Sequence, residues 1–229
     1  MILRPFFLAA ASGLTIILGT PSGMAQVSEP VRLDRPFSCT IPASQRKQEE
    51  GCYILAAEVL TSLPEAPLFW HLYTYPTIQA ATLAKGTSAG TVVKALGKAW
   101  FFNIAAKDWR PRGGERVAVV GPLPRFPAKT YVARYMEDVS SLPMERTPVH
   151  RHPGVEAWFL LGGSQCMQTP GKTSVIHSGE TAFVPAGVPM QLTNTGTETR
   201  RSIVLVLHNA ALLWRARVSD WKPNAACPN

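Results

Sequence analysis

The segment His150-Arg151-His152-Pro153-Gly154-Val155-Glu156 constrains the fold more than any other part of the sequence. Alternate side chains of a β-strand point to the same face, so the two histidines converge. Proline followed by glycine is typical of a turn, which lets the chain fold back and bring Glu156 opposite the histidines. Two imidazoles and one carboxylate suit Fe²⁺ and also accept Mn²⁺, Ni²⁺ or Zn²⁺. The segment therefore predicts a divalent metal site with positions open for water or substrate.

A second segment, from Gly179 to Asn194, completes a recognisable pair of motifs. The first segment, extended to Gly163, resembles cupin motif 1, which reads His-x-His, three residues, Glu, six residues and Gly. The second resembles cupin motif 2, which reads Gly, five residues, Pro-x-Gly, two residues, His, three residues and Asn. Every element of motif 2 is present except the histidine, whose position carries Met190. The surroundings are similar to a group of bacterial cupin-domain proteins, so the chain resembles the cupin superfamily.

This resemblance implies an all-β fold, a cupin β-barrel of the antiparallel double-stranded jelly-roll type. In metal-binding cupins the ligands of motif 1 hold the ion, which implies ligand roles for His150, His152 and Glu156. Met190 stands in the place of the fourth ligand, and a thioether binds hard divalent ions weakly, so we expect it to pack beside the site. Met144 stands where motif 1 usually begins with a glycine that serves a turn.

A ligand pocket is expected beside the predicted metal site. Its expected lining residues are Met190, Leu192, Asn194 and Trp158. His177 and His208 are alternative ligands, although His177 lies in a predicted turn and His208 ends an apolar strand. A different interpretation is that the two histidines and the glutamate only line the barrel and bind no metal. His71 lies in an aromatic strand and is expected to be a packed core histidine.

Alternating and apolar segments predict a chain built mainly of short strands. The expected strands cover 52–59, 68–75, 91–96, 99–105, 116–120, 129–136 and 201–207, with one short helix near 78–84. The proline-rich stretch 121–127 suggests the main internal boundary. We therefore expect an irregular arm at 26–50, a β-rich accessory region at 51–127, the cupin barrel at 128–214 and a tail at 215–229. A degenerate second barrel in the accessory region is the less favoured alternative.

Residues 1–25 predict a secretory signal peptide, because Arg4 precedes a short apolar run that ends in small residues. The mature chain would begin at Gln26 and be periplasmic or secreted. The four cysteines all follow this point and are Cys39, Cys52, Cys166 and Cys227. Disulfides are therefore expected, and of the three pairings we favour one that joins Cys39 to Cys52. The alternative is that some cysteines stay free, Cys166 in particular.

The formal net charge of +8 at pH 7 is compatible with acidic ligands or anionic surfaces. The basic residues are scattered, which argues against nucleic acid binding, and no segment of the mature chain has the length of a membrane span. No nucleophile elbow or dinucleotide fingerprint is present. The expected partner is a small molecule, and a homodimer stays open.

Two functions fit these features. The first is an exported metal-dependent cupin that acts on a small molecule as a dioxygenase, isomerase or lyase. The second is a cupin without catalytic activity that binds or senses a small molecule. The missing fourth ligand at Met190 supports the second, whereas the three predicted ligands and the predicted export support the first.

Overall fold

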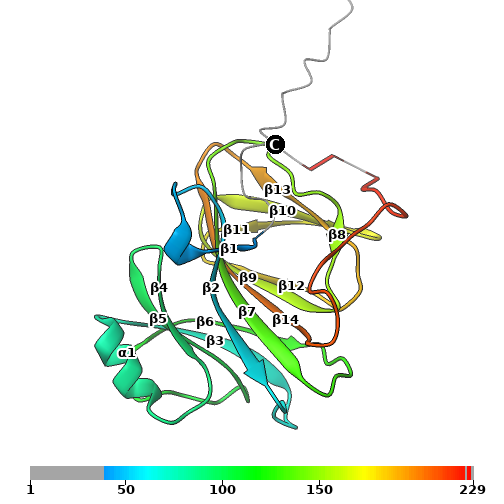
Figure 1. Cartoon of the computed structure of the whole chain (residues 1–229). Coiled ribbons are helices and arrows are strands. Elements are labelled where there is room, and N and C mark those ends of the chain that lie inside the picture. The colour runs from blue at the N-terminus through cyan, green and yellow to red at the C-terminus, as the bar shows by residue number, and fades with distance from the viewer. Residues whose placement is uncertain (1–38, 225, 228–229) are drawn as a thin grey trace, which may run out of the picture. The chain divides into compact units, whose positions relative to one another are not determined.

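Short β-strands make up nearly all of the regular structure (Figure 1). The structure is a computed structural model and describes residues 39–224 and 226–227. Its strands are β1 (Ile41–Pro42), β2 (Gly51–Leu60), β3 (Leu68–Tyr75), β4 (Thr91–Ala95), β5 (Lys98–Ala105), β6 (Glu115–Leu123), β7 (Tyr131–Ser140), β8 (His150–Arg151), β9 (Gly154–Gly162), β10 (Ser164–Thr169), β11 (Lys172–His177), β12 (Thr181–Val184), β13 (Gln191–Thr195), β14 (Arg200–Asn209) and β15 (Ala216–Arg217). One 3-10 helix, η1 (Ala43–Gln45), and one α-helix, α1 (Ile78–Lys85), complete the elements. The predicted signal peptide and the first part of the predicted arm lie outside the described residues.

A central sheet of six strands in the order β1-β2-β7-β14-β9-β12 separates two hydrophobic cores. Its pairs are antiparallel except the short β1–β2 pair. Successive side chains of β14 enter opposite cores: Ile203, Leu205 and Leu207 pack on one side, and Val204 and Val206 pack on the other. Because both faces are covered, this strand is almost continuously apolar.

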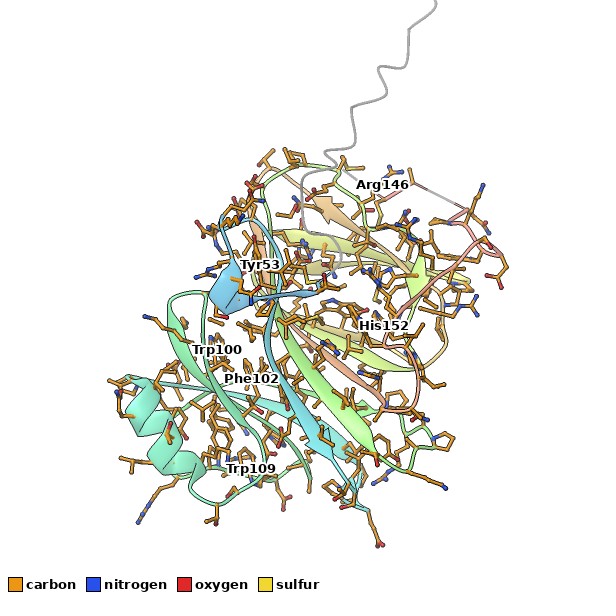
Figure 2. The ribbon with its side chains drawn as sticks, viewed as in Figure 1. Tyr53, Trp100, Phe102, Trp109, Arg146 and His152 are labelled. Atoms are coloured by element: carbon orange, nitrogen blue, oxygen red, sulfur yellow. A yellow bond between two sulfur atoms is a disulfide. The ribbon has the colours of Figure 1, made fainter. Side chains whose placement is uncertain are left out.

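The first core lies between the central sheet and a second sheet in the order β4-β5-β3-β6. Large aromatic side chains fill it, among them Trp70, Trp100 and Phe102 on the second sheet and Tyr135 on β7. Figure 2 shows Trp100 and Phe102 on this sheet. Helix α1 begins at the N-cap Thr77, whose side chain accepts a hydrogen bond from the Ala80 amide, as is common at helix starts. The first half of the chain therefore supplies a sheet that covers the outer face of the central sheet.

The second core lies between the central sheet and a three-stranded sheet in the order β11-β10-β13. It buries Trp158 and Leu160 of β9 against Met167 of β10 and Leu192 of β13. The short pair β15–β8 lies at the open end of this arrangement. Sheets of antiparallel strands that enclose a core in this way confirm the predicted all-β, jelly-roll type of fold.

The predicted strands and helix agree with the structure to within a few residues, apart from the longer β6 and β7. The predicted division at 127/128 stays a prediction. The central sheet takes strands from both sides of it, because β2, within the predicted accessory region, pairs with β7 along most of its length. The predicted tail contains β15 and Cys227, and so contributes a strand and a cross-link.

All four cysteines form disulfides. The predicted pair Cys39–Cys52 is confirmed, and Cys166 pairs with Cys227. The alternative of a free Cys166 is therefore wrong. The C-terminal tail returns to β10 and brings Cys227 to Cys166, although the two are far apart in the sequence. Two disulfides are consistent with an extracellular or periplasmic protein. Within residues 39–224, no helix has the length and apolar character needed to cross a membrane.

Candidate metal centre

The backbone around β8 and β9 positions the three predicted ligands. His150 lies in β8, where its amide and carbonyl exchange hydrogen bonds with the carbonyl and amide of Met190. The chain turns at Pro153, and β9 begins at Gly154, whose missing side chain allows close approach to the backbone of β14. Glu156 then lies on the inner face of β9, the same face as Trp158. Local turn chemistry and strand alternation therefore bring the carboxylate to the histidines, as the sequence predicts.

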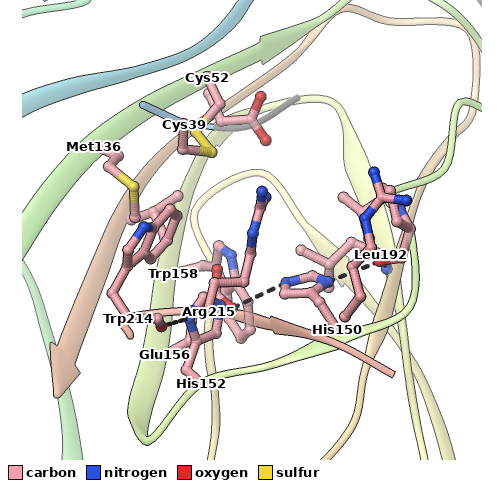
Figure 3. Close-up of a pocket in the computed structure, with 15 residues that line it drawn as sticks. Cys39, Cys52, Met136, His150, His152, Glu156, Trp158, Leu192, Trp214 and Arg215 are labelled. Carbon is pink, nitrogen blue, oxygen red and sulfur yellow. Dashed lines mark hydrogen bonds and ion pairs between the residues drawn. A yellow bond between two sulfur atoms is a disulfide. The ribbon is translucent and has the colours of Figure 1, made fainter. Parts of the chain in front are cut away.

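The ligand atoms of His150, His152 and Glu156 lie within 4.8 Å of one another (Figure 3). Glu156 Oε2 is 2.9 Å from His152 Nε2 and 3.7 Å from His150 Nε2. Two atoms that each bind one ion at about 2.1 Å are at most about 4.2 Å apart. Both separations are therefore compatible with one shared ion. The three side chains are buried, with exposed fractions of 8%, 2% and 6%.

Backbone carbonyls fix the orientation of both imidazoles. His150 Nδ1 lies 2.8 Å from the Pro148 carbonyl oxygen, and His152 Nδ1 lies 2.6 Å from that of Trp214. A carbonyl only accepts, so each Nδ1 carries the proton and each Nε2 presents its lone pair toward Glu156. Metal-binding histidines commonly donate their second ring proton to a carbonyl in this way. Both rings are thus held in the tautomer that a metal ligand needs.

Two buried polar atoms of the site without hydrogen-bond partners in the described chain also fit a bound cation. His152 Nε2 and Glu156 Oε2 are buried and have no hydrogen bond of normal geometry among the described residues, despite their 2.9 Å separation. Burial raises the pKa of Glu156, but the two neighbouring histidines oppose this more strongly and lower that pKa to about 2. Buried polar atoms without partners are rare in native proteins. An ion between them would satisfy both atoms and the ionised carboxylate.

A C-terminal segment, residues 209–218, crosses the open end of the barrel, and we call it the strap. Its Trp214 ring stacks on the His152 ring, with centroids 5.3 Å apart and an interplanar angle of 26°. The guanidinium carbons of Arg134 and Arg215 lie 5.1 and 5.2 Å from the centroid of the same indole. Strand β15 then pairs with β8, and Arg217 lies opposite His150. The strap therefore fixes one predicted ligand directly and holds the strand that carries the other.

A cavity of about 240 Å³ opens beside the three predicted ligands. The side chains around it are Cys39, Cys52, Met136, Asp138, Thr147, Pro148, His150, His152, Glu156, Trp158, Leu192, Val204, Trp214, Arg215 and Arg217. The cavity is mostly apolar, and its polar lining consists of the three predicted ligands, Asp138, Thr147 and the two arginines, a composition typical of a small-molecule site.

Two of the four predicted pocket residues line this cavity, namely Trp158 and Leu192. Met190 is buried in the second core and is not among the lining residues, and its backbone hydrogen-bonds to that of His150. Asn194 also lies elsewhere: its amide group donates to Ser140 and to the Leu142 carbonyl and holds the loop that precedes β8. At the position where cupin motif 2 has a histidine, this chain therefore has a methionine that packs in the second core.

The alternative histidines lie outside the group of potential ligands. His177 is exposed, and its backbone amide contacts Glu180. His208 is buried, its Nδ1 lies 3.0 Å from the Asn209 carbonyl oxygen, and burial lowers its pKa. His71 is fully buried in the four-stranded sheet, with Nε2 2.9 Å from the Ala106 carbonyl oxygen. Among the described residues, only His150, His152 and Glu156 form a group of three or more placed to hold an ion.

Trp214, Arg215 and Arg217 of the strap are site residues that the sequence did not predict. The sequence shows the arginines only as part of a scattered basic composition. One available signal was the sequence Trp-Arg-Ala-Arg, which places the two arginines on one face of an extended chain. Nothing in it indicates which part of the barrel the strap covers.

Comparisons with known proteins give one family match and several solved structures that are similar to part of the chain. Residues 139–206 match the family model of the cupin domain. A cupin-like protein from Thermotoga maritima is 21% identical, with 38% of this chain and 64% of that chain aligned at a TM-score of 0.35. A protein with a double-stranded β-helix domain from Klebsiella pneumoniae is 18% identical, with 39% and 76% aligned at a TM-score of 0.32. The polyketide cyclase RemF from Streptomyces resistomycificus is 25% identical, with 39% and 63% aligned at a TM-score of 0.31.

The aligned part spans less than two thirds of the first of these proteins. No curated protein matches the chain. The family match itself covers both motifs, from the end of β7 to β14, and includes all three predicted ligands. Residues 139–206 are therefore a cupin domain, in agreement with the resemblance of the two sequence motifs.

Proposed function

We propose that the chain is an exported cupin that binds one divalent metal ion through His150, His152 and Glu156 and receives a small molecule in the adjoining cavity. The observation that carries the proposal is the orientation of the two imidazoles. Each ring donates Nδ1–H to a backbone carbonyl and turns Nε2 toward a buried, ionised carboxylate. Nitrogen and oxygen donors of this kind accept Fe²⁺, Mn²⁺, Ni²⁺ or Zn²⁺. A bound ion would supply Lewis acidity or an oxygen-binding position, as dioxygenases, isomerases and lyases of this fold require.

The chain's own residues perform three tasks in such a site. Trp214 stacks on His152 and limits the access of water to that side of the site. A deprotonated Glu156 would offset part of the charge of a bound cation. The apolar walls formed by Met136 and Val204 remove a ligand from water beside the ion, which strengthens the electrostatic interactions there.

Metal content tests this proposal directly. After purification without a histidine tag and loading with each of the four ions, we expect about one ion per chain in the wild type. His152→Ala and Glu156→Gln should each reduce bound metal to background, measured by inductively coupled plasma mass spectrometry. His177→Ala, which removes an exposed histidine outside the group, should retain wild-type metal content. Equal, substoichiometric metal in the wild type and in both site variants would overturn the proposal.

Metal removal should also lower the melting temperature. An ion that binds only the folded state stabilises it by RT ln(1 + [ion]/Kd), which is about 2.7 kcal/mol at a hundredfold excess over Kd. We therefore expect a chelator to lower the wild-type melting temperature by several degrees. The melting temperature of Glu156→Gln should be the same with and without chelator. An equal chelator effect on both proteins would show that the ion binds elsewhere.

The second candidate function is a cupin that binds or senses a small molecule without catalysis. It is favoured by the composition of the cavity, whose two carboxylates are both engaged: Asp138 pairs with Arg200, and Glu156 faces the histidines. Neither is placed as an evident general base. Stabilisation by an organic ligand that persists in the presence of a chelator would favour this function over the metal-dependent one.

A further inference from the structure

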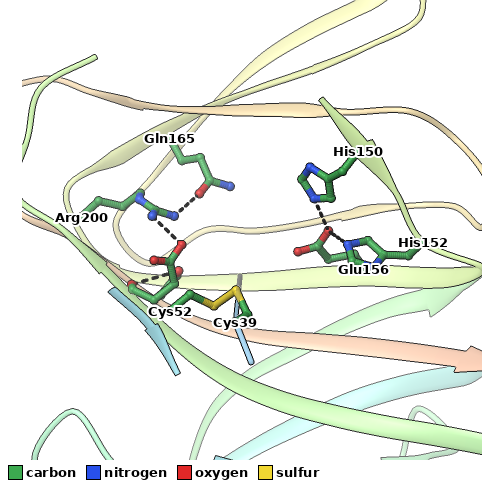
Figure 4. The surroundings of a disulfide bond; sticks show 9 residues. Cys39, Cys52, His150, His152, Glu156, Gln165 and Arg200 are labelled. Atoms are coloured by element: carbon green, nitrogen blue, oxygen red, sulfur yellow. Dashed lines mark hydrogen bonds and ion pairs between the residues drawn. A yellow bond between two sulfur atoms is a disulfide. The ribbon is translucent and has the colours of Figure 1, made fainter. Parts of the chain in front are cut away.

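One side of the cavity carries an excess of positive charge. Arg215 and Arg217 of the strap both line it, and the acidic lining residues are Asp138 and Glu156. Asp138 is neutralised from outside the lining by Arg200, whose Nη2 lies 2.5 Å from Asp138 Oδ2 (Figure 4). Glu156 is occupied by the ligand trio. The cavity therefore attracts an anion, and a divalent ion at the trio would increase this attraction.

Arg215 interacts electrostatically with Arg217 and with Glu156. Burial lowers the pKa of Arg215, Glu156 raises it, and Arg217 lowers it further. Figure 3 shows Arg215 in the same cavity as His150 and Glu156. Repulsion between the two positively charged guanidinium groups is unfavourable. A bound anion would reduce this repulsion and accept charge-assisted hydrogen bonds from both groups. Guanidinium groups match the planar geometry of a carboxylate particularly well.

The other walls of the cavity indicate the chemistry of the rest of the ligand. Met136, Leu192, Val204 and the ring of Trp158 present apolar surface to the cavity. Trp158 is fully buried, so the wall that it forms is rigid. The volume of about 240 Å³ limits the ligand to a small molecule. A highly charged, strongly hydrated ion such as phosphate fits these walls less well than an organic acid.

We propose that the cavity binds a small organic monocarboxylate, with the carboxylate held by Arg215 and Arg217 and a compact apolar body packed against the Trp158 side. This inference rests on the proposed function, because it names the ligand class of the same site. The arginines come from the strap, so ligand specificity lies in a segment outside the matched cupin domain at 139–206.

The test is calorimetric titration of the full chain with benzoate and propanoate, with benzamide and propanamide as neutral counterparts and inorganic phosphate as a second anion. We expect at least one acid to bind more tightly than its amide and than phosphate. Arg215→Gln should weaken that binding roughly tenfold or more, as loss of a hydrogen bond to a charged group does. Arg217→Gln, at a more exposed position, should weaken it less. Arg112→Gln, at an exposed loop position between β5 and β6, is the matched control and should bind as the wild type does.

Metal content measured on the same samples separates this inference from the proposed function. Both arginine variants should retain wild-type metal content, since neither side chain belongs to the ligand group. If metal binds but neither acid binds more tightly than its amide, or if phosphate binds as tightly as the acids, the carboxylate inference is overturned and the metal site stands. If no metal binds but the acids bind in an Arg215-dependent way, the inference stands and the metal proposal fails.

Discussion

Removal of the Cys166–Cys227 disulfide, by Cys166→Ala/Cys227→Ala, is expected to lower the free energy of unfolding by about 4 kcal/mol in the chain-entropy account of cross-links. The reason is the length of chain that it closes, since the two cysteines are 61 positions apart. The Cys39–Cys52 pair closes only 13 positions and is expected to contribute about 3 kcal/mol. Urea unfolding of the oxidised proteins measures both values.

The comparison between the two disulfides provides the control. Each double variant removes two sulfur atoms from largely buried surroundings, so their packing costs are similar and the difference reflects the closed loops. A larger loss of stability for Cys39→Ala/Cys52→Ala than for Cys166→Ala/Cys227→Ala would contradict the prediction.

The longer cross-link should also affect the metal site through the strap. Cys227 lies beyond Trp214, whose carbonyl accepts from His152, and Cys166 lies in β10. Without the disulfide the strap keeps the β15–β8 pairing, and Asp220 just beyond it keeps its 2.7 Å ion pair with Arg151. We therefore expect metal affinity to fall by roughly tenfold, the lower end for loss of a partner that orients a ligand.

The sequence predicted those parts of the fold that depend on local periodicity. β3 shows the clearest agreement, since Leu68–Tyr75 is bounded by prolines and rich in aromatic residues. The convergence of His150, His152 and Glu156 was predictable for the same reason, because a strand, a Pro-Gly turn and a second strand are all local features. Met144 adopts a left-handed conformation with φ of 59°, which agrees with the turn predicted where motif 1 usually has glycine.

The strap could not be predicted because its contacts are distant in sequence and partly involve the backbone. His152 is oriented by the carbonyl of Trp214, and a carbonyl is present at every residue, so the sequence contains no sign of it. The pairing of Arg217 with His150 depends on the tail crossing the barrel. A prediction from alternation likewise placed Asn194 in the pocket, whereas its hydrogen bonds to Ser140 and Leu142 hold a loop.

The central sheet shows a similar limit of sequence reasoning. A proline-rich stretch usually marks a boundary, yet β6 continues through Gly121 and Pro122 to Leu123. Gly121 has a φ of +146°, and a Cβ there would lie 2.8 Å from the Leu68 carbonyl oxygen. The stretch therefore serves close pairing of β6 with β3, which only the three-dimensional neighbours reveal.

Gly154→Ala is expected to destabilise the protein by about 3 kcal/mol, the upper end for forcing extra atoms into a packed interior. Gly154 pairs with His208 at the start of β9, and an added Cβ would lie 1.9 Å from the Leu207 carbonyl oxygen and 2.5 Å from the His208 Cα. Both are backbone atoms of a central strand, so no side chain can rotate away. Relief requires β9 to move away from β14, and Glu156 lies two residues further along β9.

Gly162→Ala, at the other end of the same strand, is the matched control. Its added Cβ would meet only the Thr199 carbonyl oxygen at 3.5 Å, an ordinary contact, so we expect a change in stability within about 1 kcal/mol. Chemical unfolding measures both variants, and metal content reports whether the displacement reaches Glu156. We expect Gly154→Ala to lose bound metal together with stability and Gly162→Ala to lose neither. Equal stability of the two variants would show that β9 and β14 do not approach this closely at Gly154, and the positioning of Glu156 would then need another explanation.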